Sequence, residues 1–183
     1  GHDNPVALHQ LTIDWRQALN LDSDFDGLAN NKEGDQDDDD TIDLDEGETF
    51  PLDADSDDDG VPDGNDPIPT TPDSDADGLP DGLEMGVTTA IPEFNDGSVI
   101  SGTDTTKTFT YDSQQRLCFI ADTDPSTKTD PLSDDTDKDG LKDGSEDLTS
   151  NGKYEVATET NPLDKDTDDD GLPGLASHKF HQA

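Results

Sequence analysis

The sequence predicts a mostly irregular fold, a tandem array of loops rather than a domain built around one large core. Hydrophobic residues make up only 26 % of the 183 residues, which leaves little apolar surface to bury. Alternating Asp residues followed by Gly recur in two blocks, 12 to 20 residues apart within each block, and such internal repeats are typical of arrays. Pro62, Pro80 and Pro173 fall inside these repeats and prevent long flanking helices.

The chain is strongly acidic, and its charge excludes several classes of partner. It contains 48 Asp and Glu residues against 10 Lys and Arg, so the formal net charge is −38. A polyanion is repelled by nucleic-acid phosphates and by anionic membrane surfaces. The longest apolar run, 117–121, is far too short to cross a bilayer. We therefore expect no nucleic-acid partner and no membrane insertion. From its composition, the chain is either a disordered acidic segment or a protein whose fold requires bound cations.

Four stretches match the ligand pattern of a calcium-binding loop completely. Acidic or amide side chains occupy positions 1, 3, 5, 9 and 12, Gly at position 6 permits the sharp turn, and position 7 offers its carbonyl. Each loop is named here after its first residue. The predicted ligands are Asp22, Asp24, Asp26, Leu28, Asn30 and Glu33 in loop 22; Asp55, Asp57, Asp59, Val61, Asp63 and Asp66 in loop 55; Asp73, Asp75, Asp77, Leu79, Asp81 and Glu84 in loop 73; and Asp135, Asp137, Asp139, Leu141, Asp143 and Glu146 in loop 135.

Three further loops match the pattern in part. Loop 35 has Asp40 in place of the turn Gly, and loop 147 keeps the Gly but carries less charge and is closed by Thr158 or Glu159. Loop 166 has Gly174 at position 9 and Ser177 at position 12, so we interpret it as a repeat cut short. Their predicted ligands are Asp35, Asp37, Asp39, Asp43 and Glu46; Asp147, Asn151 and Glu155; and Asp166, Asp168, Asp170 and Leu172.

The loops resemble thrombospondin type 3 repeats, in the long cysteine-free form common in secreted and surface bacterial proteins. The motifs that carry the resemblance lie at 55–63, 73–81 and 129–143, and the repeats cover 22–84 and 130–174. The resemblance implies an irregular backbone wrapped around a row of calcium ions. The paired cysteines of the animal family are absent here, so disulfide bracing is not expected.

Other calcium folds and other metals fit the sequence less well. An EF-hand needs a helix on each side of its loop, and the prolines oppose this. A dockerin has only two loops, and the glycine-rich nonapeptide of calcium β-rolls is missing. Magnesium demands six short octahedral bonds, whereas zinc and copper prefer His or Cys. We assign no native metal role to the His178 and His181 pair in the C-terminal tail.

Calcium is expected to be part of the fold. Two carboxylates about 4–5 Å apart repel by roughly 3–4 kcal/mol at an effective dielectric constant near 20. Each loop brings four or five carboxylates together, so a loop without metal should open. We also expect the aliphatic residues at position 7 to pack between neighbouring loops and to couple them.

The repeats divide the chain into four segments. Residues 1–21 are compatible with a short N-terminal helix over 4–20, with Asn4 as N-cap, Pro5 in the first turn and Trp15 on the apolar face. Residues 22–84 form a first array of loops, 85–129 an insertion, and 130–183 a second array whose last repeat is truncated.

The insertion is predicted to contain a β-hairpin. Its strands lie at 107–111 and 116–120 around a turn at 112–115. The single cysteine, Cys118, cannot form an internal disulfide, and we expect a buried, inert thiol. A small satellite core is expected from Val87, Ile91, Phe94, Val99, Ile100, Phe109, Leu117 and Phe119. The alternative is that these clustered aromatic residues form a recognition surface.

The sequence contains no nucleophile elbow, phosphate loop or paired Cys and His, so we expect no enzyme activity. The favoured function is a calcium-binding structural spacer or scaffold, stiffened by about five to seven ions, in a secreted or cell-surface protein with flanking domains. One alternative is a calcium-dependent adhesion or recognition module that binds an extracellular protein or glycan through 85–129. Another is a calcium buffer or a disordered acidic segment.

Overall fold

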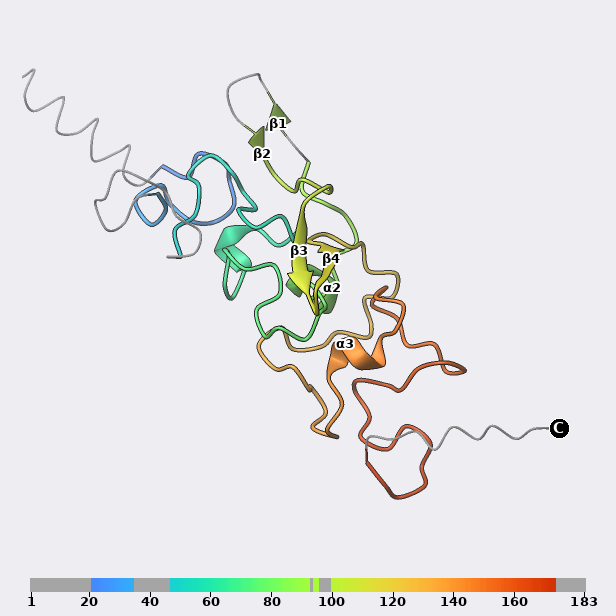
Figure 1. The fold of residues 1–183 in the computed structure, drawn as a ribbon. Helices are drawn as coiled ribbons and strands as arrows, with labels where there is room; N and C mark the ends of the chain where they lie inside the picture. Colours follow the sequence, from blue (N-terminus) through green and yellow to red (C-terminus); the bar gives the residue numbers. More distant parts are fainter. Residues whose placement is uncertain (1–20, 35–46, 93, 96–99, 174–183) are drawn as a thin grey trace, which may run out of the picture.

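The computed structural model describes residues 21–34, 47–92, 94–95 and 100–173. Most of this backbone is turns and bends (Figure 1). Its helices are one turn long, with α2 at Asp81–Glu84, α3 at Asp143–Glu146 and a 3₁₀ helix, η2, at Asp63–Asn65. The predicted irregular, loop-rich fold is therefore confirmed. The helix expected over 4–20, loop 35 and Val99 lie outside the described residues.

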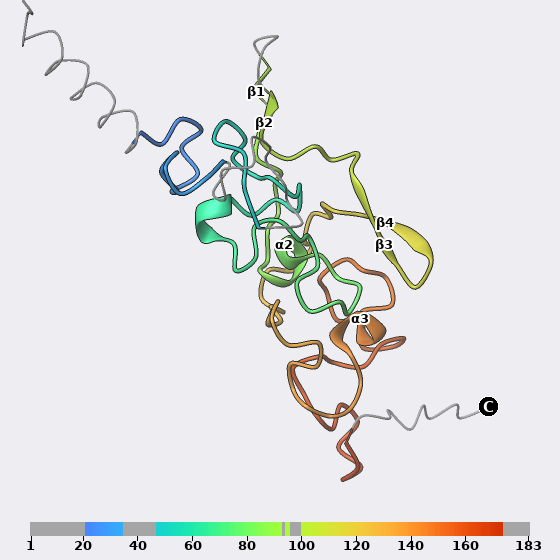
Figure 2. The ribbon, with the colours of Figure 1, turned by 60° about the vertical axis from the view of Figure 1, so that its left-hand side comes forward.

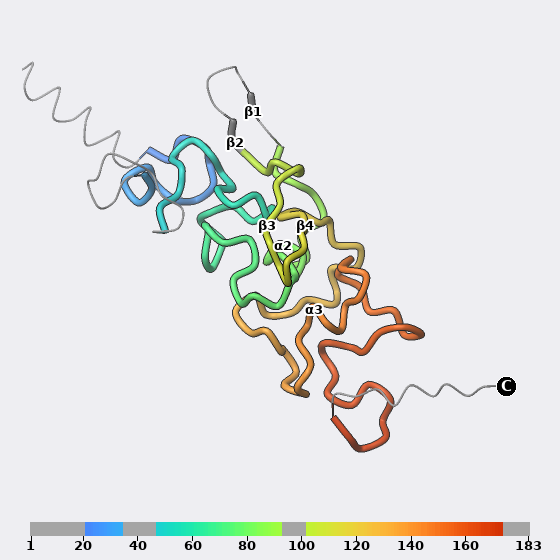
Figure 3. Tube along the Cα trace, in the orientation of Figure 1, coloured from blue at the N-terminus to red at the C-terminus, as the bar shows by residue number. Residues whose placement is uncertain are grey.

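The loops follow one another along an elongated body. In Figures 1 and 3 the chain passes from loop 22 through loops 55 and 73 to loops 135 and 166 at the opposite end. None of the helices in the described part of the chain has the length and apolar character that a membrane span requires.

The insertion forms two small antiparallel hairpins. Strand β1 (Phe94–Asn95) pairs with β2 (Ile100–Ser101), and β3 (Thr108–Tyr111) pairs with β4 (Gln114–Leu117). The predicted hairpin corresponds to β3 and β4 and is confirmed. Its expected four-residue turn at 112–115 and the expected extension of its second strand to Ile120 are wrong. The turn has two residues, Asp112 and Ser113, with φ of 47° and 64°. Two positive φ angles match the twist of a tight hairpin, so strand pairing resumes at once.

The apolar core is very small. In the described residues it consists of Ala54, Val61, Leu79, Leu83 and Cys118. The burial expected of Cys118 is confirmed, since its residue is only 4 % exposed. Leu117, by contrast, does not join a satellite core, because the strand alternation turns Arg116 toward the loops and leaves Leu117 44 % exposed. The position-7 residues of the loops also differ in how deeply they are buried.

Val61 and Leu79 are buried, Leu28 and Leu141 are half-buried, and Leu172 is 65 % exposed. The burial that packing between loops requires is therefore present in the middle of the array and absent at Leu172 of loop 166. In the interior, carboxylates take the place of apolar side chains. The fully buried acids are Asp55, Asp59, Asp77, Asp81 and Asp143, each 0 % exposed.

Successive loops touch through a glycine at position 10. The N–H of Gly82 in loop 73 donates to Asp59 Oδ2 of loop 55 at 3.0 Å, and the N–H of Gly144 in loop 135 donates to Asp77 Oδ2 of loop 73 at 2.6 Å. Loop 135 therefore contacts loop 73 directly, although 50 residues separate Glu84 from Asp135. The chain leaves the row of loops at the insertion and returns to it at loop 135, so the row itself is continuous.

The close approach explains why position 10 is Gly. A Cβ at Gly64 of loop 55 would lie 2.6 Å from the carbonyl oxygen of Asp26 in loop 22. At Gly82 and Gly144 it would overlap the carbonyl oxygens of Asp59 and Asp77 in the same way. Any side chain at this position would push the neighbouring loop away.

Replacing Gly82 by Ala should separate loops 55 and 73. We expect Gly82→Ala to lower the free energy of unfolding by about 1–3 kcal/mol, because the added methyl meets backbone that cannot move aside. Urea unfolding in excess calcium measures the loss. Asn31→Ala is the matched control, since Asn31 has position 10 in loop 22 but is exposed. Equal stability of Gly82→Ala and the unsubstituted protein would contradict the stacking role.

Candidate metal centre in the acidic loops

The six described loops share one backbone template with two left-handed residues. The Gly at position 6 has positive φ in every loop, as the turn requires. The residue at position 4 also has positive φ, although none of these residues is Gly, and this feature was not predicted. The position-4 residues are Phe25 (66°), Asp58 (69°), Ala76 (59°), Lys138 (65°), Ser150 (48°) and Asp169 (57°).

Two hydrogen bonds fix each loop around its first and fifth side chains. The N–H of the position-6 Gly donates to one oxygen of the position-1 Asp. These pairs are Gly27 with Asp22 (3.3 Å), Gly60 with Asp55 (2.9 Å), Gly78 with Asp73 (3.1 Å), Gly140 with Asp135 (2.9 Å), Gly152 with Asp147 (2.8 Å) and Gly171 with Asp166 (2.8 Å). The N–H of position 7 donates to Oδ1 of position 5, for example from Val61 to Asp59 at 2.7 Å.

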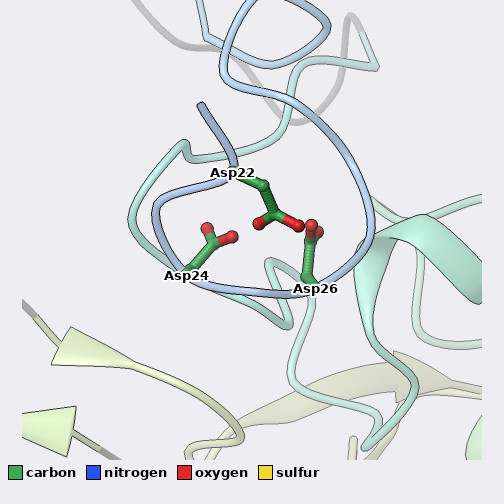
Figure 4. Close-up of side chains that lie close together, drawn as sticks. All are labelled: Asp22, Asp24 and Asp26. Atoms are coloured by element: carbon green, nitrogen blue, oxygen red, sulfur yellow. The ribbon is translucent and has the colours of Figure 1, made fainter. Parts of the chain in front are cut away.

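The position-3 carboxylate points into the loop with a buried oxygen that has no hydrogen-bond partner. Figure 4 shows this for loop 22, where the carboxylates of Asp22, Asp24 and Asp26 converge. Such oxygens are rare in folded proteins, and each needs an explanation. The oxygens concerned belong to Asp24 (both), Asp57 Oδ2, Asp75 Oδ2, Asp137 Oδ2 and Asp168 Oδ2. Loop 147, with Thr149 at position 3, lacks this group.

The first three acids of a loop form one kind of cluster. In loops 22, 55 and 73, one oxygen from each of positions 1, 3 and 5 lies within 4.8 Å of the others. Two oxygens on opposite sides of one calcium ion are about 5 Å apart, because the Ca–O distance is about 2.4 Å. The sequence-predicted residues at these positions are therefore brought together at a spacing that fits calcium.

Position 9 lies in a second kind of cluster, at the junction between loops. Asp63 of loop 55 groups with Asp26 and Glu33 of loop 22, again within 4.8 Å. In the next junction, Asp81 of loop 73 groups with Asp59 and Asp66 of loop 55. The sequence pattern placed position 9 on its own loop's ion, whereas here its carboxylate faces the acids of the preceding loop.

A hydroxyl residue at position 2 holds the position-9 side chain in this place. Ser56 donates from its N–H and its hydroxyl to Asp63 at 2.8 and 2.6 Å, and Thr136 does the same to Asp143. Ser74 donates twice to Asp81, and in loop 22 the pair is Ser23 with Asn30. The sequence reasoning missed position 2. Its signal was the recurrence of Ser or Thr directly after the first Asp.

Burial and mutual repulsion raise the pKa values of the glutamates at position 12 of loops 22, 73 and 135. Burial, followed by Asp24 and Asp26, raises the pKa of Glu33 to about 8, and burial with Asp77 and Asp75 raises that of Glu84 to about 10. Burial with the acids of loop 135 raises the pKa of Glu146 to about 8. In the absence of metal these three glutamates therefore favour their protonated form. A cation placed among them would reverse this preference.

The three partial loops differ in how well they are formed. In loop 147, Glu159 rather than Thr158 closes the loop, since it is 4 % exposed and accepts the N–H groups of Thr149 (3.1 Å) and Glu155 (2.9 Å). Glu155 instead pairs with Lys153 at 3.3 Å. Loop 166 has the template up to Leu172, and its positions 9 to 12 lie outside the described residues, as does all of loop 35.

The arrangement of the described acids is suited to holding hard cations. The clusters named above contain only carboxylate oxygens, the ligands that calcium and magnesium prefer. Comparison of the chain with protein-family models, with curated proteins and with solved structures gave no match.

The raised pKa values predict that the metal-free chain is more compact in mild acid. The ordinary pKa of Glu is 4.5, and the folded values of Glu33 and Glu84 are about 8 and about 10. The folded form therefore binds more protons than the unfolded form across this window, so its stability falls as pH rises from about 4.5 toward 8. Small-angle scattering in EDTA should give a smaller radius of gyration at pH 5 than at pH 8.

Excess calcium supplies the control for this pH dependence. In excess calcium the carboxylate oxygens bind calcium at pH 8 and either calcium or protons at pH 5. The calcium-loaded chain should therefore be as compact at pH 8 as at pH 5. A metal-free chain with the same dimensions at pH 5 and pH 8 would contradict the repulsion between buried acids.

Proposed function

We propose that the chain is a calcium-binding structural array that acts as a stiff spacer or scaffold in a secreted or cell-surface protein. The observation that supports it best is the position-3 carboxylate, whose buried oxygen has no hydrogen-bond partner in each of the five described loops that has an Asp there. A calcium ion among positions 1, 3 and 5 would satisfy these oxygens. The resemblance to thrombospondin type 3 repeats points in the same direction.

The ligand set favours calcium over other cations. Calcium accepts six to eight oxygens in flexible geometry, whereas magnesium requires a strict octahedron and gives up its water reluctantly. The loops offer carboxylates, a carbonyl and further acids at the junction with the next loop. This supply exceeds what magnesium takes from a protein, and it lacks the nitrogen and sulfur ligands of zinc and copper.

A spacer role follows from where the ions would lie. Each ion would lie beside a contact between loops of the kind that joins the carboxylate of Asp59 to Gly82 and that of Asp77 to Gly144. A filled array would be stiff along loops 22, 55, 73 and 135, because each of these loops would be fixed both to its own ion and to its neighbour. Extracellular calcium is millimolar, which suits loops of moderate affinity. We expect flanking domains of a larger protein on this array and no catalytic role for it.

The alternative of a recognition module through 85–129 has less support. Phe119, one of the aromatic residues that suggested a recognition surface, packs on the turn glycine Gly60, and Tyr111 of β3 packs on the turn glycine Gly78. These side chains are therefore engaged with the array. An extracellular protein or glycan bound by the outer face of the β3–β4 hairpin stays a second candidate.

Calorimetric titration of the chelator-treated chain with calcium tests the proposal. We expect about five to seven ions per chain, because seven loops carry the acidic pattern, four of them completely and three in part. Circular dichroism recorded along the same titration should change with the binding, since the loops close around the metal. A count of two or fewer, or an unchanged spectrum, would contradict a calcium array.

A variant at Asp59 tests the shared role of position 5. Asp59 is fully buried and belongs both to the cluster of loop 55 and to the junction with loop 73. Asp59→Asn removes one negative charge from both clusters, and we expect the affinity of the tightest sites to fall by at least about tenfold. Asp112→Asn in the exposed hairpin turn is the matched control, because it removes the same charge outside any loop. Equal losses from the two variants would indicate a non-specific effect of net charge.

A further inference from the structure

Three loops have their turn glycine covered by a side chain from the insertion. A Cβ at Gly60 would lie 2.7 Å from Phe119 Cδ2, and one at Gly78 would lie 2.7 Å from Tyr111 Cε1. The carboxylate of Asp122 lies against Gly152 in loop 147 in the same manner. The insertion therefore meets loops 55, 73 and 147 at the same point of the repeat, the sharp turn at position 6.

Residues 102–104 also hydrogen-bond to loop 55 and to Asp53 just before it. The N–H of Gly102 donates to Asp53 Oδ1 at 2.8 Å, and the N–H of Asp104 donates to Asp58 Oδ1 at 2.5 Å. Between them the hydroxyl of Thr103, 2 % exposed, donates to Asp55 Oδ2. Asp55 Oδ2 is thus fully engaged, while its Oδ1 is buried without a partner. The segment leaves one oxygen of the position-1 Asp free to bind an ion.

Loop 73 is tied to the hairpin by a cation. Arg116 stacks on the ring of Tyr111, with 4.9 Å from its Cζ to the ring centroid, and its Nη1 donates to the carbonyl of Gly78 at 2.9 Å. Figure 2 shows the β3–β4 hairpin along one side of the row of loops. Residues 102–119 are called the cover from here on.

The remaining described loops have open turns. Nothing lies within 4 Å of a Cβ built at Gly140 or Gly171, and at Gly27 only a backbone atom of Gly64 lies near, at 3.8 Å. Burial follows the same division. Asp55 is 0 % exposed and Asp73 is 8 % exposed, whereas the position-1 residues of loops 22, 135 and 166 are half-buried.

We propose that the cover locks calcium into loops 55 and 73, so that the array contains slowly exchanging ions at its centre and rapidly exchanging ions in loops 22 and 135. This inference rests on the proposed function. An ion leaves a loop when the turn opens, and in loops 55 and 73 Phe119 and Tyr111 must first move off the glycines. The cover in turn binds to carboxylates that are held in place only when the loop is closed, so cover and ion stabilise each other.

The release of calcium into an excess of fluorescent chelator tests the cover. In a stopped-flow experiment on the calcium-loaded full chain we expect two phases, a fast one from the open loops and a slow one from the covered loops. Phe119→Ala should speed the slow phase by about tenfold and leave the fast phase unchanged, because a partly buried aromatic contact is lost. Leu117→Ala, an exposed residue of the same hairpin, is the matched control and should change neither phase.

Thr103→Val provides a second variant in case Phe119→Ala fails to fold. It removes the hydroxyl bonded to Asp55 and keeps the shape of the side chain, so it should also speed the slow phase. Cys118 gives an independent readout on the unsubstituted protein. This residue is buried, directly precedes Phe119 in the sequence, and is the single cysteine of the chain. A thiol reagent should modify it slowly in calcium and at least about tenfold faster in chelator, as expected when the cover opens.

The outcomes separate the cover from the calcium function. A single release rate for all ions, or a slow phase that neither variant accelerates, overturns the cover while calcium binding stands. The same holds if Cys118 reacts equally slowly with and without calcium. A chain that binds no calcium in the titration described above refutes the proposed function, and the cover with it.

Discussion

The repulsion between buried carboxylates is the constraint on which this fold depends. Five Asp side chains in the described part of the chain are fully shielded from water, yet the salt bridges of Lys142 with Asp134 and of Lys153 with Glu155 both lie at the surface. Burial of unpaired charge is among the most unfavourable events in folding. The Thr103 hydroxyl and the Gly60 N–H offset part of it at Asp55, but burial, followed by repulsion from Asp53, still raises the pKa of this residue to about 6. The N–H groups at positions 2, 6 and 7 hold the side chains of positions 9, 1 and 5 in place, as Ser56, Gly60 and Val61 do in loop 55.

The sequence predicted the parts of the loops that depend on local chemistry. The alternation of Asp at positions 1, 3 and 5 and the Gly at position 6 describe a tight turn with inward-pointing carboxylates, and the described loops have that geometry. The partners of position 9 and the close approach at Gly82 depend instead on contacts between loops, which spacing along one loop does not contain. The left-handed residue at position 4 was also missed, since Phe25 and Lys138 have side chains that disfavour positive φ.

The insertion shows the same division between local and long-range information. Alternating polar and aromatic residues predicted the β3–β4 hairpin, although its turn is shorter than expected because Asp112 and Ser113 both adopt positive φ. No local signal indicated that Tyr111 and Phe119 would lie on the turn glycines of loops 73 and 55. A glycine required by the turn also presents a flat patch of backbone, and an aromatic ring fits such a patch well. The insertion can therefore pack on the array without a large apolar core of its own.

The contact at position 10 also gives the row of loops a direction. Each of loops 55, 73 and 135 contacts the preceding loop of the row through the Asp-Gly pair at its positions 9 and 10. The preceding loop contributes its position-5 Asp to this contact, not its own Asp-Gly pair. This is a head-to-tail interface, in which the two contacting faces differ, so the same contact can be repeated along the row. Loop 22 has Asn30-Asn31 in place of Asp-Gly, so it can receive a neighbour but lacks the glycine needed to approach one. A whole loop can thus be gained or lost by duplication or deletion without changing the geometry of the contacts that remain.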